Sequence, residues 1–427
     1  MSQPNPPLSS EIDSTVDKKK IFPNRTSLSE AASVAFSESK ETHSNTPDLV
    51  CFSHLRWDFV YQRPQHLLSR CAQERRTFFI EEPIFESSAS WWLEVSRREC
   101  GVWVAVPHLP NGMSEEMLSA MQQSLIDELF AEFKISKPIL WYYTPIALSF
   151  TNHLESSCIV YDCMDELSAF KGASTTLKDW EAQLFKRADA VFTGGQSLYE
   201  AKQHQHPNVH PFPSSIDVNH FAQSRSITIE PADQACIGHP RLGFYGVVDE
   251  RMDLALLDGI AQARPNWQLV IIGPVVKIDP ESLPHRPNIH YLGGKSYPEL
   301  PHYLAGWDVA LLPFALNEST RFISPTKTPE YLAAGKPVVS TAIRDVVRPY
   351  AHQQLVHIAD GAEAFVEKAE IAMQQTQADP DWRDRVDAFL THTSWDKTWA
   401  AMTHLISAAI EKQSIALESV SLRNSNV

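Results

Sequence analysis

The chain has 427 residues, of which 43% are hydrophobic and 21% charged, and its formal net charge is −15. This length exceeds what one hydrophobic core usually supports, so two domains are expected. The negative charge argues against a nucleic-acid partner, because phosphate-backbone binding needs a concentrated positive field. No apolar run is long enough to span a bilayer. Six scattered cysteines, without a CxxC pair or zinc-type spacing, favour reduced thiols in a cytoplasm over disulfides or structural zinc.

Both ends of the chain are polar. Residues 1–46 are rich in Ser, Pro, Asn and Glu and lack apolar periodicity, so we expect a disordered tail. No apolar segment of the secretory-signal kind follows Lys18, Lys19 and Lys20. Near the other end, an amphipathic helix over residues 394–412 is predicted to cross back to the first domain, followed by a polar tail over 413–427.

Between the tails, short continuous apolar runs alternate with longer amphipathic segments. Such runs are typical of strands buried on both faces of a parallel sheet. The predicted fold class is therefore α/β, with two doubly wound Rossmann-like domains over residues 47–220 and 221–393. Ligands of such sheets bind at the carboxyl ends of strands, so functional residues are expected just after strands. The predicted strands are 49–53, 77–81, 102–106, 139–143, 159–162 and 190–193, then 242–245, 268–272, 289–292, 309–312, 338–341 and 356–358.

The most informative segment, residues 317–337, reads NESTRFISPTKTPEYLAAGKP and directly follows a predicted strand. Thr328 is a suitable N-cap and Pro329 fits the first position of a helix. Gly335 can end that helix in the left-handed conformation. The segment therefore predicts a short helix entered through a polar loop.

This loop, residues 324–327, leads to the helix amino terminus, whose free N–H groups favour an anion such as a diphosphate. Lys327 would add a point charge there. Glu330 follows in the first helical turn, where a carboxylate can accept hydrogen bonds from both hydroxyl groups of a ribose. The alternative stays open that Glu330 only complements the helix dipole.

Residues 324–341, SPTKTPEYLAAGKPVVST, resemble the donor-site segment of GT-B fold glycosyltransferases, especially bacterial enzymes of surface-polysaccharide assembly of the teichuronic-acid and exopolysaccharide type. The wider resemblance covers roughly residues 48–405. It implies that Glu330 holds the ribose of a nucleotide-sugar donor and that Lys327 contacts its diphosphate. The predicted donor site also includes Gly246, Arg251, Arg321, Ser324 and Thr326.

One position departs from the family pattern. Many retaining members of glycosyltransferase family four carry two acids with seven residues between them, but the position eight before Glu330 is Phe322, and the nearest acid is Glu318. Retention or inversion of the anomeric configuration is therefore not inferred.

Arg251 follows five residues after Gly246, which ends the first predicted strand of the second domain. Related transferases often place a phosphate-contacting cation at this spacing. A guanidinium there can stabilise the leaving diphosphate, so we expect neither a catalytic metal nor a cofactor. A surface ion pair with Asp249 or Asp253 is the alternative.

Candidate catalytic bases follow strands of the first domain. Asp162 and Asp165 come after residues 159–161, and an inverting transferase needs a carboxylate or a histidine to take the proton of the acceptor hydroxyl. Asp165 can instead cap the next helix. His54, in the loop after the first strand, is the other candidate base.

The loop that carries His54 also holds Trp57, Gln62 and Arg63, just before a helix start at Pro64. We expect these side chains to open onto the cleft and contact acceptor or donor phosphate. Arginines of this stretch could face an anionic membrane or acceptor, or simply be solvated; they are Arg63, Arg70, Arg75, Arg76, Arg97 and Arg98.

Together with the resemblance, these residues predict a cytoplasmic glycosyltransferase, at most peripheral to the inner face of a membrane. It would move sugar from a nucleoside-diphosphate sugar to a saccharide or lipid-linked saccharide. Two alternatives stay open: a non-hydrolysing nucleotide-sugar epimerase, which needs no acceptor, and a non-catalytic nucleotide-sugar-binding subunit of a polysaccharide assembly complex. The nucleotide base, the sugar and the acceptor are not readable from the sequence.

Overall fold

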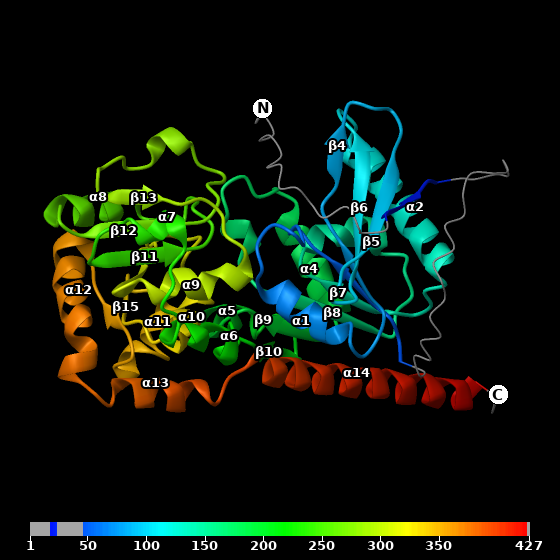
Figure 1. Cartoon of the computed structure of the whole chain (residues 1–427). Helices are drawn as coiled ribbons and strands as arrows, with labels where there is room; N and C mark the ends of the chain where they lie inside the picture. The colour runs from blue at the N-terminus through cyan, green and yellow to red at the C-terminus, as the bar shows by residue number, and fades with distance from the viewer. Residues whose placement is uncertain (1–17, 24–45, 425–427) are drawn as a thin grey trace.

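The computed structural model describes residues 18–23 and 46–424. Two α/β domains lie side by side, and the last helix, α14 (Trp395–Asn424), runs along the edge of the first (Figure 1). Each domain has one sheet covered by helices, as predicted for this fold class.

The sheet of the first domain has the order β1-β5-β6-β3-β2-β7-β8-β9-β10, with β4 beside β6. All six predicted strands are present and pair in parallel, while β5 and β1 add an antiparallel edge. The strands are β1 (Lys18–Ile21), β2 (Leu49–Phe52), β3 (Thr77–Ile80), β4 (Ile84–Glu86), β5 (Trp92–Arg97), β6 (Trp103–Pro110), β7 (Ile139–Tyr142), β8 (Cys158–Cys163), β9 (Ala190–Thr193) and β10 (Val209–Pro211). The helices are α1 (Arg63–Cys71), α2 (Glu115–Phe133), α3 (Leu148–Thr151), α4 (Leu177–Arg187) and α5 (Gln196–Lys202).

The second sheet is entirely parallel, in the order β13-β12-β11-β14-β15-β16. Its strands are the six predicted ones: β11 (Arg241–Tyr245), β12 (Gln268–Ile272), β13 (Ile289–Tyr291), β14 (Val309–Leu312), β15 (Val338–Ser340) and β16 (His357–Ile358). The helices are α6 (Val218–Ala222), α7 (Ala232–Ala235), α8 (Leu254–Ala263), α9 (Leu300–Ala305), α10 (Lys327–Ala333), α11 (Arg344–Val347), α12 (Gly361–Ala378) and α13 (Trp382–Leu390).

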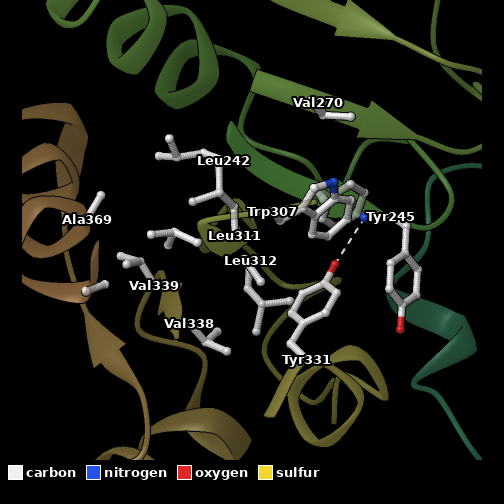
Figure 2. Packing of buried hydrophobic residues seen from close by; sticks show 14 of the residues in the cluster. Leu242, Tyr245, Val270, Trp307, Leu311, Leu312, Tyr331, Val338, Val339 and Ala369 are labelled. Atoms are coloured by element: carbon white, nitrogen blue, oxygen red, sulfur yellow. Dashed lines mark hydrogen bonds between the residues drawn. The ribbon is translucent and has the colours of Figure 1, made fainter. Parts of the chain in front are cut away.

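The core of the second domain fixes α10 against the end of β11 (Figure 2). Tyr331 is fully buried, and its hydroxyl accepts a hydrogen bond of 3.0 Å from the backbone N–H of Tyr245. The rings of Tyr331 and Trp307 pack with centroids 5.9 Å apart. Because this buried hydroxyl group depends on the N–H of Tyr245 for its hydrogen bond, the bond fixes the position of α10 along β11. The neighbouring side chains of α10 therefore have fixed positions relative to the end of β11.

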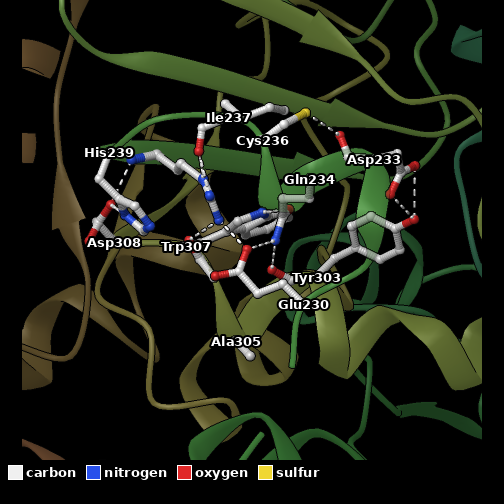
Figure 3. Close-up of polar contacts among 12 residues, drawn as sticks. Glu230, Asp233, Gln234, Cys236, Ile237, His239, Tyr303, Ala305, Trp307 and Asp308 are labelled. Carbon is white, nitrogen blue, oxygen red and sulfur yellow. Dashed lines mark hydrogen bonds and ion pairs between the residues drawn. The ribbon is translucent and has the colours of Figure 1, made fainter. Parts of the chain in front are cut away.

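A buried polar network ties the segment before β11 to the second domain (Figure 3). Arg241 is 2% exposed, pairs with Glu230 and donates to the carbonyl of Ile237. Gln234 donates to the carbonyl of Tyr303 over 2.9 Å. These contacts attach the segment around residues 230–237 to the second domain.

The predicted domain boundary at residue 220 is a few residues too late. Ile216 and Phe221 already pack in the core of the second domain, with Ile216 1% exposed. Ser215 and Thr393, where the chain crosses between domains in each direction, are hydrogen-bonded through their hydroxyl groups at 3.1 Å. The two crossings therefore lie next to each other.

Predictions for both chain ends are wrong in part. Lys18–Ile21, inside the predicted disordered tail, forms β1 because Ile21 is buried and the ammonium of Lys20 lies 3.8 Å from the ring centroid of Trp92. Residues 1–17 and 24–45 lie outside the described residues. At the other end, α14 continues to Asn424, through most of the predicted polar tail.

Helix α14 crosses to the first domain as predicted. Ser394 caps it, since its hydroxyl accepts from the N–H of Lys397 over 3.2 Å. Its apolar residues pack in a core cluster of the first domain together with Leu67 and Leu68 of α1. Those α14 residues are Trp395, Trp399, Met402 and Ile406. The last helix thereby completes the core of the first domain.

Candidate active site

Glu330 lies in α10 beside the carboxyl end of β11 and is 6% exposed. The hydroxyl of Tyr245 donates a hydrogen bond to its Oε2 atom. Burial raises the pKa of Glu330 to about 7, against the opposing effects of this hydrogen bond and of Lys327. Within the described residues, Tyr245 is the hydrogen-bond donor to this carboxyl group.

Lys327 and Gly246 are brought together, as predicted for the donor site. The ammonium of Lys327 lies 5.7 Å from the ring centroid of Phe244 on β11. A Cβ atom at position 246 would lie 2.1 Å from Cε of Lys327, and Gly246 has a φ of +137°, so both space and backbone require glycine. Burial lowers the pKa of Lys327, while Glu330 raises it. The lack of a side chain at Gly246 therefore leaves space at the end of β11 for the ammonium group of Lys327.

Arg251 lies in the loop after β11 and donates to Asp249, with Nη2 2.7 Å from Oδ2. Asp249 is 3% exposed, so this pair is an oriented internal contact. The guanidinium also lies 5.5 Å from the ring centroid of Phe170 in the first domain, and its charge lowers the pKa of Lys327. Asp249 therefore fixes the guanidinium of Arg251 next to Phe170 of the first domain.

The remaining predicted donor residues divide into two groups. Ser324 and Thr326 lie at the domain junction, where the hydroxyl of Ser214 donates to the carbonyl of Ser324 over 2.7 Å. The Oγ atom of Ser214 also lies 3.5 Å from Oγ1 of Thr326. Arg321 has a 64% exposed side chain that pairs with Glu318, so it makes no contact with the Glu330 carboxyl group.

Helix α10 begins at Lys327, so the prediction that Thr328 is its N-cap is wrong. Thr326 occupies the cap position with helical backbone angles and makes no capping bond. The side chain of Thr328 is instead buried in the helix, with no hydrogen-bond partner in the described chain. Gly335 ends the helix with a φ of +73°, as predicted.

Asp162 is fully buried in β8 and accepts hydrogen bonds from Arg63. Nε of Arg63 lies 2.9 Å from Oδ2 and Nη2 lies 2.8 Å from Oδ1, while Nη1 donates to the carbonyl of Phe212. Burial raises the pKa of Asp162 more than Arg63 lowers it. The expectation that Arg63 opens onto the cleft is wrong, and the geometry gives Asp162 a structural role.

Asp165 is differently placed. The 3₁₀ turn after β8 has Glu166 in its cap position, so Asp165 does not cap it. Burial raises the pKa of Asp165, and Arg251 and Lys277 of the second domain oppose this effect. Because both cations belong to the second domain, Asp165 faces charges on the other side of the domain boundary.

His54 follows β2 and is half-buried. Burial, and to a lesser extent Lys277, lowers its pKa to about 4, while a hydrogen bond with the backbone of Tyr143 opposes the shift. Nδ1 has no partner among the described residues. The imidazole is therefore neutral at pH 7, and the lowered pKa makes it a weak base.

Two other predicted cleft residues support the loop that carries His54. Trp57 is 7% exposed and packs against Phe79, with ring centroids 5.1 Å apart, so its predicted exposure to the cleft is wrong. Gln62 is the cap residue of α1, and its N–H donates to the side chain of Gln65 over 3.0 Å. Pro64 stands in the first turn, as predicted.

The arginine-rich stretch is not a free basic surface. Arg63 is buried against Asp162, and the exposed Arg97 has its guanidinium 5.6 Å from the ring centroid of Trp103. The other four arginines form ion pairs with nearby acids, which neutralises much of the charge expected to face a membrane or an acceptor. The pairs are Arg70–Asp396, Arg75–Glu74, Arg76–Asp48 and Arg98–Asp58.

Sequence reasoning missed Tyr245, Phe170 and Lys277. Tyr245 reads as the last residue of a buried strand, and its hydroxyl contact with Glu330 depends on tertiary structure. Lys277 lies in the loop after β12, and its ammonium is 5.1 Å from the ring centroid of Phe170. Its backbone has a φ of +62°, which no local pattern indicates for a lysine.

A cavity of about 870 Å³ lies at the domain junction, away from these charged groups. Its lining includes Ser214, Ser324, Asp345 and Tyr350, and none of the residues that surround Glu330. Within the described residues, no cluster of His, Cys, Asp and Glu side chains has the arrangement of a metal site. The buried charges around Glu330 therefore identify the candidate active site better than cavity size does.

Comparison with known proteins finds similarity to glycosyltransferases. Residues 239–375, which carry Gly246, Arg251, Lys327 and Glu330, match the family described as Glycosyl transferases group 1. This segment of the second domain is thus similar to that family. Over 249 residues the chain is 24% identical to a putative teichuronic acid biosynthesis glycosyltransferase, TuaH, of Bacillus subtilis. This match covers 54% of the chain and 62% of the relative, so the chain spans less than two thirds of that protein.

Solved structures extend the likeness to both domains. Sucrose-phosphate synthase from Thermosynechococcus elongatus superposes with a TM-score of 0.62 at 14% identity, over 87% of this chain and 100% of that one. Anabaena HepE, solved with UDP-glucose, has a TM-score of 0.61 at 12% identity, over 84% and 99% of the two chains. The chain therefore has a GT-B fold, and the segment similar to group 1 glycosyl transferases lies in its second half.

Proposed function

We propose that the chain is a glycosyltransferase that moves a sugar from a nucleoside-diphosphate sugar to a hydroxyl acceptor in surface-polysaccharide or glycolipid synthesis. The observation that carries this proposal is the buried Glu330 carboxyl group, which interacts with Lys327, while Lys327 interacts in turn with Arg251. A carboxylate suits ribose hydroxyls and the cations suit a diphosphate. The teichuronic acid name of the Bacillus relative and the UDP-glucose bound to HepE support the acceptor and donor classes.

In the proposed reaction, Arg251 stabilises the diphosphate as negative charge develops on its leaving oxygen. Asp165 takes the proton of the acceptor hydroxyl, because it faces cations of the second domain and is not consumed by a capping or ion-pair contact. The neutral imidazole of His54 is the alternative base. Asp162 and Arg63 hold the loops of the first domain in place behind these groups.

The test is nucleotide binding measured by calorimetry and thermal shift in EDTA, using UDP, ADP, GDP and their glucose conjugates. At a hundred times the dissociation constant, a ligand of the native state adds roughly 2.7 kcal/mol of stability. At least one nucleoside diphosphate should bind in EDTA. Failure of all of them would remove the proposed function, and binding abolished by EDTA would remove its metal independence. Isomerised donor formed without acceptor would indicate an epimerase instead.

The Glu330→Gln substitution is expected to weaken binding of the nucleotide-sugar by about 1 to 3 kcal/mol, because a charged acceptor of ribose hydroxyls becomes neutral. Binding to the unmodified protein should also depend on pH. Ribose hydroxyls donate to the ionised carboxylate, and its pKa in the free protein is about 7, so affinity should fall as pH decreases below about 7.

Calorimetry between pH 5.5 and 8.5 measures both effects, and a nucleotide-sugar is preferred to a free nucleotide because it has no terminal phosphate that titrates in this range. Glu318→Gln is the matched control, since Glu318 has a 77% exposed side chain in the preceding loop. An affinity of the Glu330→Gln variant equal to that of the unmodified protein would contradict the ribose assignment.

Peripheral contact of the first domain with a membrane stays a prediction. The ion pairs of its arginines remove the feature that suggested it. In the part of the chain that the structure describes, no helix is long and apolar enough to cross a bilayer. Co-sedimentation with anionic and neutral vesicles checks the prediction, and equal absence of binding to both would refute it.

A further inference from the structure

Phe170 of the first domain contacts two cations of the second. Cζ of Arg251 lies 5.5 Å from the centroid of its ring, and Nζ of Lys277 lies 5.1 Å from the same centroid. The two cations come from different loops, one after β11 and the other after β12. Phe170 directly follows the short 3₁₀ turn Leu167–Ala169 and is half-buried. One phenyl ring therefore joins two loops across the cleft.

The loop that carries Lys277 is built to bring it there. The N–H of Val276 donates to the carbonyl of Val248 over 3.0 Å, and Val248 pairs with Val275 in a parallel bridge. Lys277 then adopts a left-handed backbone with a φ of +62°. This conformation costs energy for a residue with a side chain, and such strain concentrates where a functional group has to be placed.

The ring contacts both cations, and the carboxyl group of Asp165 also acts electrostatically on both. The carboxylate of Asp249 pairs with Arg251 alone. Lys277 has no carboxylate within ion-pair distance in the described chain, although it acts electrostatically on Asp165 and His54 of the first domain. The negative face of an aromatic ring attracts an ammonium and a guanidinium alike, so Phe170 stabilises their approach.

We propose that Phe170 is a positioning residue that holds Arg251 and Lys277 as a cation pair for the donor diphosphate, and that the first domain thereby completes the diphosphate site of the second. The inference rests on the proposed function, because it assigns a supporting residue to the same site. It predicts that a side chain of the first domain controls affinity for diphosphate, although Glu330, Lys327 and Arg251 all belong to the second domain.

The experiment compares UDP with UMP by calorimetry, or the matching pair of whichever nucleotide binds the unmodified protein. Phe170→Leu should weaken UDP binding on the order of tenfold and UMP binding much less, because a cation–π contact contributes a factor of this order. Phe170→Tyr should retain affinity, because it keeps the ring. Lys277→Met should reproduce the selective loss. Phe85→Leu is the control, since Phe85 is an exposed phenylalanine on β4 of the same domain.

Phenylalanine carrying one, two or three ring fluorines at position 170 separates electrostatics from shape. Fluorination weakens the negative face with little change in size, so UDP affinity should fall in graded steps. Equal affinities across this series, equal losses of UDP and UMP affinity in Phe170→Leu, or tighter UDP binding by that variant would each overturn the inference. If the unmodified protein binds no nucleoside diphosphate, the proposed function fails. If the unmodified protein and Phe170→Leu bind UDP with equal affinity, only this inference fails.

Discussion

Asp165→Asn is expected to lower kcat by about a hundredfold or more while leaving donor affinity nearly unchanged. The side chain faces the second domain, whose Arg251 and Lys277 interact with it, and makes no structural capping contact. Asparagine keeps the size and polarity of aspartate but cannot accept the proton of the acceptor hydroxyl. Steady-state kinetics with the acceptor varied, together with calorimetry of donor binding, measures the two quantities separately.

His54→Ala is the companion variant, because the imidazole of His54 is the other neutral or anionic base near the cleft. If Asp165→Asn turns over normally and His54→Ala is inactive, the base assignment moves to His54. If both variants remain active, a general base from the first domain is not used and the inverting scheme is wrong.

Asp162→Asn is expected to act on stability instead, lowering the free energy of unfolding by about 3 to 5 kcal/mol. The substitution leaves the guanidinium of Arg63, whose side chain is 6% exposed, without its counter-charge. Urea unfolding of the two proteins measures the difference. If the free energy of unfolding falls by less than about 1 kcal/mol and turnover is lost, Asp162 is again a candidate base.

The double variant Arg63→Met/Asp162→Leu provides the control for this stability effect. Burial raises the pKa of Asp162 despite the neighbouring guanidinium, so desolvation outweighs attraction in the pair. Replacing both charges with apolar side chains of similar size should therefore restore much of the stability that the single substitution removes. Its activity then reports whether either group is needed for chemistry.

Most parallel strands were predictable from the sequence because they are buried on both faces and read as apolar runs. The short, partly exposed parallel strands β4 and β10 were not predicted. β9 (Ala190–Thr193), β12 (Gln268–Ile272) and β14 (Val309–Leu312) have the predicted bounds. β1 was not predictable, because three lysines in four residues have the composition of a tail. Its pairing depends on β5 and on the ring of Trp92, which are distant in sequence.

The candidate site was predictable where local chemistry sufficed. Gly246 and Lys327 were both assigned to the donor site, and the structure brings them into contact. Arg63 and Trp57 were misplaced because polarity and loop position do not reveal a buried counter-charge such as Asp162 or a packed ring such as Phe79. Contacts across the domains, such as those of Phe170, require the tertiary structure.

The return of α14 to the first domain has a consequence for synthesis of the protein. A ribosome releases the first domain before the second, and domains usually fold in that order. Here Trp395, Trp399, Met402 and Ile406 belong to the core of the domain that emerges first. Leu67 and Leu68 consequently lack part of their apolar cover until nearly the whole chain has been made. Until α14 has been synthesised, the first domain exposes an apolar surface at Leu67 and Leu68 that can promote aggregation. A chain that ends before residue 395 keeps this apolar surface exposed.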